Sequence, residues 1–119
     1  MKNTNTLLEK YISAAVTHGE ATLEGDGKTA NKQYATLTKF YRKLEKDQSF
    51  AEVFLEELFH HTNASVRTWA AAHALGLNLR TDKALEILQA VSEDRNIGVV
   101  RLDAEMILRE WMKKGRLKF

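Results

Sequence analysis

The sequence contains no cysteine and no proline, and only six of its 119 residues are glycine. The lack of cysteine excludes a disulfide framework and thiol chemistry, and it suits the reducing cytoplasm. Because proline breaks helices and glycine weakens them, their scarcity leaves long stretches free to be helical. We find neither an N-terminal apolar segment suited to a signal peptide nor the roughly eighteen-residue apolar run of a membrane span. We therefore expect a cytoplasmic protein without a membrane-embedded part.

The charge is nearly balanced, with 18 basic and 16 acidic residues and a formal net charge of +2. Such a balance predicts no general attraction to polyanions. The hydrophobic fraction of 44% and the charged fraction of 29% are typical of a soluble globular domain. We expect residues 1–119 to form one domain, large enough to bury a core without metal or disulfide crosslinks.

Apolar residues recur at three- and four-residue steps along most of the chain, and no alternating stretch is long enough to indicate a sheet. Five predicted helices cover residues of about 5–23, 28–46, 50–61, 64–77 and 98–114. A sixth lies between the last two and begins at a cap formed by Thr81 or Asp82. Because the connections are short, we predict an all-α fold, a short right-handed α-α superhelix of about three antiparallel helix pairs.

Cap-forming residues define several of these predicted ends. Asn5 or Thr6 is expected to cap the first helix. Ser49 with Glu52 three residues later matches a capping box at the start of the third helix. Gly115 is expected to end the last helix in a left-handed conformation.

Two stretches, 63–75 and 96–108, repeat one pattern. Each has Val-Arg in its first turn and Ala three positions after the Arg, and the two copies are 34 residues apart. This period is typical of stacked helical hairpins. Such helices need apolar residues on more than one side, which the second copy supplies with Leu102 and Met106 beside its main apolar line. Arg67 opposes the helix dipole, so we expect an acidic or carbonyl partner for it, such as Asp103.

The Val-Arg-x-x-Ala pattern resembles the second helix of HEAT-type repeats, although the Ala-Leu-Gly ending at 74–76 comes one position late. With the stretches 103–111 and 114–119 included, the chain resembles the bacterial domain-of-unknown-function 2019 family. The resemblance covers about residues 5–119, with specific residues in the second half only. It implies a small HEAT-like superhelix. Members of such families are often encoded beside polymorphic toxins, which implies an immunity role; no catalytic motif carries over.

Polar and large residues within the repeats are the candidates for binding a partner. Trp69 and His73 are four residues apart on one side of a helix and could grip a ligand or a partner side chain. Alternatively, they lie at the edge of the core with their N–H groups bonded to backbone carbonyls. Glu105 departs from the repeat pattern, and Arg42 and Lys43 lie on the most basic helix, so these three are also candidate partner-binding residues.

His60 and His61, with Glu56 and Glu57 four residues before them, have the spacing of paired metal ligands. Adjacent histidines point in different directions on a helix, however, and the sequence offers no third ligand. Favourable placement of histidine at a helix C-terminus explains them better. We expect no metal and no cofactor.

Basic residues gather in two places, where they suggest a nucleic-acid surface. One is the predicted second helix, with Lys32, Lys39, Arg42, Lys43 and Lys46. The other is the stretch 113–118, which follows Trp111 and contains Lys113, Lys114, Arg116 and Lys118. In the tail, Leu117 and Phe119 indicate instead that the segment docks on the body.

The sequence has no Gly-x-Ser-x-Gly, no phosphate loop and no carboxylate pair in an apolar setting, so we expect no enzyme and assign no catalytic residues. We predict a non-enzymatic protein-binding module, an immunity protein that binds and neutralises a cognate bacterial toxin. We expect it to be a monomer or a weak homodimer. The alternatives are a HEAT-like nucleic-acid-binding protein, against which the near-neutral charge argues, and a structural adaptor that dimerises through its end helices.

Overall fold

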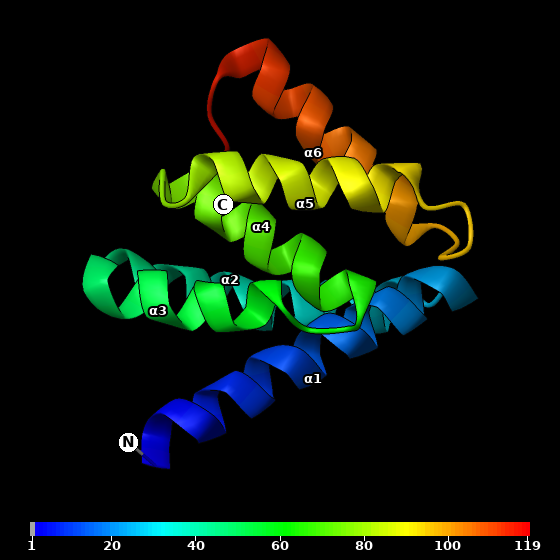
Figure 1. Ribbon diagram of the computed structural model, residues 1–119. Coiled ribbons are helices and arrows are strands. Elements are labelled where there is room, and N and C mark those ends of the chain that lie inside the picture. The colour runs from blue at the N-terminus through cyan, green and yellow to red at the C-terminus, as the bar shows by residue number, and fades with distance from the viewer. Residues whose placement is uncertain (1) are drawn as a thin grey trace.

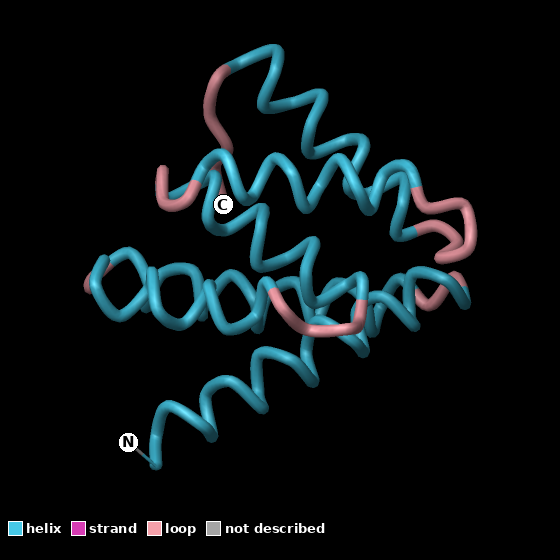
Figure 2. The backbone as a smooth tube through the Cα atoms, in the orientation of Figure 1, coloured by secondary structure: helices cyan, strands magenta, loops and turns pink. Residues whose placement is uncertain are grey.

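The computed structural model describes the backbone of residues 2–119 and the side chains of residues 5–119; over this range it consists of helices joined by short connections (Figures 1 and 2). The helices are α1 (Lys2–Glu24), α2 (Gly27–Glu45), α3 (Gln48–Phe59), α4 (Ala64–Leu77), α5 (Thr81–Glu93) and α6 (Val100–Lys114). Consecutive helices pack against each other. The predicted all-α fold is confirmed. No helix in the described part of the chain combines the length and apolarity needed to cross a membrane.

The helix α4 forms the centre of the molecule. It packs against α1, α3, α5 and α6, and Figure 1 shows it crossing obliquely between the α2 and α3 layer and α5. Nine of its fourteen residues are buried. Since neighbours approach from several sides, close packing requires small side chains, which Ala70, Ala71 and Ala74 provide at full burial.

The second copy of the repeat pattern, in α6, has a different environment. Only Ala104 is fully buried there, while Leu102 and Met106 are 44% and 64% exposed. Both side chains were expected to pack beside the main apolar line of this helix. They are exposed because α6 is the last helix of the described chain and packs mainly against α4 and α5.

The predicted N-terminal caps are wrong at three helices. Asp47, not Ser49, caps α3, since its carboxylate accepts a hydrogen bond from the Phe50 backbone N–H at 3.1 Å. The helix α1 begins at Lys2, so the predicted caps at positions 5 and 6 lie inside it. The helix α5 begins after Arg80, whose backbone is left-handed with φ 47°, and no side chain caps it. These ends are set by loop backbone geometry, which a cap-residue pattern does not reveal.

Of two further predicted features, the left-handed cap at Gly115 is confirmed and the pairing of Arg67 with Asp103 is wrong. Gly115 ends α6 in the left-handed conformation (φ 69°), and its N–H donates to the Trp111 carbonyl at 2.7 Å, as expected. Asp103 does not pair with Arg67. The Arg67 guanidinium instead reaches back to the loop before α4 and donates to the carbonyls of His61 and Thr62, at 2.9 and 2.8 Å.

The revised cap of α3 gives a direct test. Asp47→Ala is expected to lower the free energy of unfolding by about 1 kcal/mol, because the Phe50 backbone N–H loses its acceptor and the start of the helix loses a favourable negative charge. Ser49→Ala is the matched control and is expected to stay within about 0.5 kcal/mol of the wild type, since Ser49 is exposed. Urea denaturation measures both; a larger loss for Ser49→Ala would restore the capping-box assignment.

Candidate functional site

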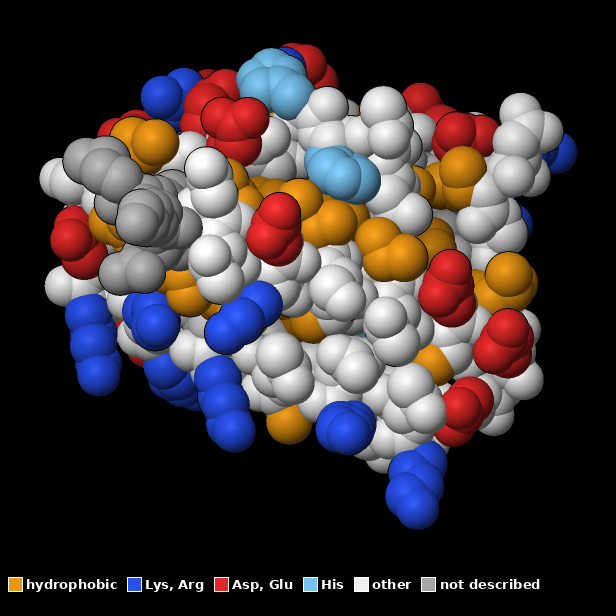
Figure 3. Space-filling model, turned by 90° about the horizontal axis from the view of Figure 1, so that it is seen from below, with side chains coloured by type: hydrophobic (Ala, Val, Ile, Leu, Met, Phe, Trp, Pro, Cys, Tyr) orange, Lys and Arg blue, Asp and Glu red, His pale blue; other side chains and the backbone are white. Residues whose placement is uncertain are grey.

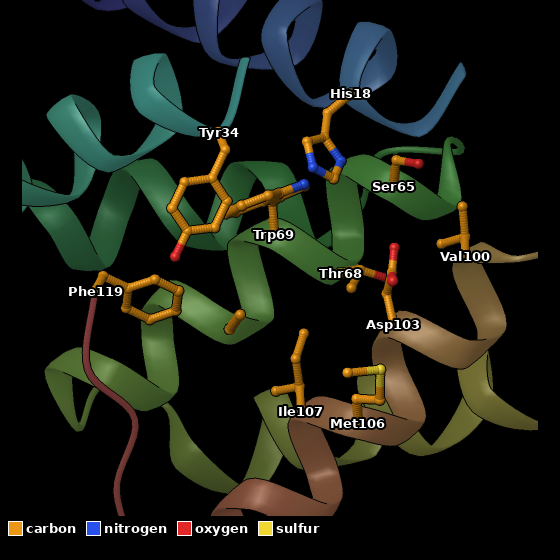
Figure 4. Close-up of a pocket in the computed structure, with 11 residues that line it drawn as sticks. His18, Tyr34, Ser65, Thr68, Trp69, Val100, Asp103, Met106, Ile107 and Phe119 are labelled. Carbon is orange, nitrogen blue, oxygen red and sulfur yellow. The ribbon is translucent and has the colours of Figure 1, made fainter. Parts of the chain in front are cut away.

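A cavity of about 280 Å³ lies between α1, α2, α4, α6 and the C-terminal segment that follows Gly115 (Figure 4). Its lining residues are His18 from α1, Tyr34 from α2, Ser65, Thr68, Trp69 and Ala72 from α4, Val100, Asp103, Met106 and Ile107 from α6, and Phe119. Five separate segments therefore contribute to one site. It exists because α4 is flanked by α1 and α6 without being fully covered by either.

Trp69 is the largest aromatic group of this wall. Its ring makes edge-to-face contacts with the rings of His18 and Tyr34, at centroid distances of 5.1 and 5.5 Å. Such contacts fix the orientation of the rings. Tyr34 is 46% exposed, so the aromatic wall continues from the interior of the cavity to the molecular surface.

Asp103 supplies the one side-chain carboxylate of the cavity wall. Partial burial raises its pKa, an effect that nearby His18 opposes. The pKa of His18 is lowered by burial, with the Asp103 charge acting in the other direction. Among residues 5–119, whose side chains the structure describes, no ion pair or hydrogen bond engages the Asp103 side chain, so its charge is only weakly compensated.

Ser65, His18 and Asp103 share the cavity, a set of residue types that serine hydrolases use. The geometry does not form such a relay. No hydrogen bond joins His18 to either of the other two within the described residues, and the Ser65 hydroxyl lies against Gly19 of α1. A Cβ atom on Gly19 would come within 2.1 Å of Ser65 Oγ.

The neighbouring Thr68 is buried, with 4% of its surface exposed, and its Oγ1 has no hydrogen-bond partner among the described residues. In Figure 4 its hydroxyl points to the same part of the cavity as Asp103. A buried hydroxyl without a partner destabilises the fold, so this polar corner is a place where stability alone does not explain the residue type.

His73 lies behind Trp69 in the core and not on the surface. Its Nδ1 shares a 2.8 Å hydrogen bond with the Tyr11 hydroxyl, and burial lowers its pKa to about 3. Its Nε2 has no hydrogen-bond partner among the residues whose side chains the structure describes. The expected backbone-carbonyl partner is replaced by a side chain from α1. Of the predicted pair, therefore, Trp69 lines the cavity and His73 has no access to a partner.

The C-terminal segment docks on the body, as its apolar residues suggested. The Phe119 ring lies against the rings of Tyr41 and His73, with centroid distances of 4.8 and 4.9 Å. The Arg42 guanidinium donates to the Phe119 backbone oxygen and also pairs with Glu45. Gly76 makes room, since a Cβ there would come within 3.0 Å of the Phe119 ring. Arg42 thus holds the segment that closes one side of the cavity.

The other predicted partner-binding residues lie apart from the cavity. Lys43 is exposed on α2, and Glu105 pairs with Arg109 along α6 at 3.2 Å. Lys43 belongs to a region of α2 with several exposed basic residues, and Figure 3 shows basic side chains gathered along one edge of the face seen from below.

The histidine pair at the end of α3 has structural partners. His60 Nε2 lies 3.2 Å from the Glu56 carboxylate, and His61 Nδ1 accepts a hydrogen bond from the Asn63 backbone N–H at 3.0 Å. Within the described residues, no group of three or more potential metal ligands comes together here or elsewhere.

The sequence did not indicate the cavity. His18, Trp69 and Asp103 come from three helices and are separated by 51 and 34 residues. No local motif links them. The only hint in the sequence was that Trp69 is much larger than the residues around it in α4. This hint pointed to one wall of the cavity and not to the others.

The chain matches no protein-family model, and neither the curated proteins nor the solved structures contain a significant match. The resemblance to the domain-of-unknown-function 2019 family gains no support from these comparisons and stays a prediction from the residues quoted for it.

Because His73 is buried, we predict that the free energy of unfolding depends on pH. An unfolded histidine has a pKa of about 6.5, whereas that of folded His73 is about 3. Below pH 6.5 the unfolded chain takes up a proton that the folded chain excludes. The free energy of unfolding therefore falls as the pH is lowered from about 6.5 toward 3, by up to about 1.4 kcal/mol per pH unit for this group.

His73→Asn, whose amide can still bond the Tyr11 hydroxyl, is expected to flatten this slope. His60→Asn removes a surface histidine and is expected to keep the wild-type slope, because it leaves the core unchanged. Urea denaturation at pH 7, 6 and 5 measures the three proteins. Equal slopes for His73→Asn and the wild type would contradict the burial of a neutral His73.

Proposed function

We propose that this protein is a non-enzymatic protein-binding module, and specifically a cytoplasmic immunity protein that binds and neutralises a cognate bacterial toxin. The observation that carries the binding part is the aromatic cavity with exposed apolar side chains at its rim. Tyr34 and Met106 line it and are 46% and 64% exposed. The toxin part is supported by the family resemblance alone.

The physical argument for a protein partner starts from these exposed side chains. Apolar and aromatic residues beside a concave site contribute most of the binding energy in many interfaces, because a partner removes them from water in a fitted pocket. Leu102, on the same helix as Met106, is also 44% exposed and extends the apolar surface. The helix α4 is fixed on several sides and so supplies a rigid base.

The size of the cavity also favours a partner side chain. Its volume of about 280 Å³ lies just below the range of about 300–1,000 Å³ that pockets for drug-sized molecules occupy. One inserted side chain, with the surrounding interface resting on the rim, suits this volume better than a large cofactor.

The exposed lysines of α2 support a second candidate, nucleic-acid binding. Lys32, Lys39, Lys43 and Lys46 are exposed, and none of them is engaged in an ion pair within the described residues. If this surface binds DNA or RNA, affinity should fall steeply with added salt. An anisotropy titration at low salt tests it, and the absence of binding there excludes this candidate.

Co-expression tests the toxin-neutralising function. Cells that produce the candidate toxin encoded beside this gene are expected to grow when this protein is co-expressed, and the two proteins are expected to co-purify. The proposal fails if the toxin stays fully lethal and the pair do not co-purify.

Surface variants test which part of the protein binds. Tyr34→Ala and Met106→Ala are each expected to weaken toxin binding by about tenfold or more, since truncation removes apolar contact at the rim. Val53→Ala is the matched control, because Val53 is 70% exposed on α3 and does not line the cavity. Isothermal titration calorimetry measures all three, and equal affinities would place the interface elsewhere.

A further inference from the structure

The Asp103 carboxylate makes the cavity more favourable for a positively charged group than for a negatively charged one. Its carboxylate is one wall of a site that is otherwise apolar, aromatic or neutral, and no cation of the described chain pairs with it. Arg67, the cation that the sequence assigned to Asp103, is occupied by loop carbonyls instead. A half-buried carboxylate without a partner is costly, and a cation entering the cavity would remove that cost.

The remaining walls suit the stem and the face of a cationic side chain. Figure 4 shows the rings of Trp69 and Tyr34 on one side of the cavity and Asp103 on another, with Met106 and Ile107 along its lower edge in that view. Aromatic rings attract ammonium and guanidinium groups through their negative faces. Aliphatic and thioether groups pack well against methylene stems.

His18 does not compete for this role. Burial lowers the pKa of His18 and so favours its neutral form, while the nearby Asp103 charge offsets only part of this effect. A neutral imidazole beside Asp103 leaves the carboxylate available and keeps positive charge from repelling an incoming cation.

We propose that the cavity receives a basic side chain, lysine or arginine, from the protein partner, with Asp103 as its counter-ion and Trp69 and Tyr34 as its aromatic wall. The inference rests on the proposed protein-binding function and adds the chemistry of the partner residue. An acidic or a purely apolar partner side chain would leave the Asp103 charge repelled or uncompensated within the interface.

Small analogues test the chemistry without the partner. Nα-acetyl-lysine methylamide and Nα-acetyl-arginine methylamide carry the two cationic side chains, and Nα-acetyl-norleucine methylamide has a similar stem without charge. Titrations followed by ¹H–¹⁵N NMR are expected to show saturable shifts at Trp69, Thr68 and Asp103 for a cationic analogue. The norleucine analogue is expected to bind at least about tenfold more weakly, as it lacks a charge-assisted contact.

Variants identify the counter-ion. Asp103→Asn is expected to weaken binding of the cationic analogue by about tenfold or more, whereas Asp103→Glu, which keeps the charge, is expected to retain most of it. Glu110→Gln removes an equal charge from the same helix outside the cavity and is expected to bind as the wild type does. Thermal melts establish that each variant is folded. If Asp103→Asn does not fold, the comparison of charged and uncharged analogues on the wild type still decides the charge requirement.

The inference is overturned if neither cationic analogue shifts the cavity residues, if norleucine binds equally well, or if a folded Asp103→Asn binds unchanged. The partner protein separates this failure from that of the proposed function. Toxin binding that is unaffected by Asp103→Asn overturns the basic-side-chain inference and leaves protein binding intact. The opposite result is that the analogue binds in an Asp103-dependent way while the toxin neither binds nor is neutralised. That result supports a cavity for basic side chains and contradicts the immunity function.

Discussion

The packing of α4 against four other helices is the constraint on which the rest of the structure depends. A helix enclosed in this way has little surface facing solvent, and the small residues Ala70, Ala71 and Ala74 let its neighbours come close. The same enclosure places His73 in the core, where it must remain neutral and bond to Tyr11 of α1. That one hydrogen bond links the first helix to the centre of the domain across 62 residues of sequence.

The cavity follows from the same arrangement. Where α4 faces both α1 and α6, its residues change from alanine to Trp69, Thr68 and Ser65, and the neighbouring helices do not close over them. The C-terminal segment completes one side through Phe119, held by Arg42 and seated on Gly76. A rigid core therefore borders a partly open aromatic cavity, whose walls are fixed by the packing of the helices around it.

Much of the fold was predictable because its causes are local. The three- and four-residue recurrence of apolar side chains follows directly from helix geometry, and the bounds predicted for α4 coincide with those observed. The 34-residue repeat and the left-handed Gly115 were readable for the same reason. The cap of α3 was not, because Asp47 and Ser49 are both good capping residues and only the backbone path decides between them.

Of the candidate site, the sequence by itself determined one residue, Trp69, which is too large for the close packing around it. The tertiary structure decided the rest. It separated His73 from the surface, turned Arg67 to the loop carbonyls and brought Asp103 and His18 to the wall beside Trp69. The physical reason is that a side chain on a helix can face several neighbours, and its contacts depend on how helices far apart in the sequence cross in space.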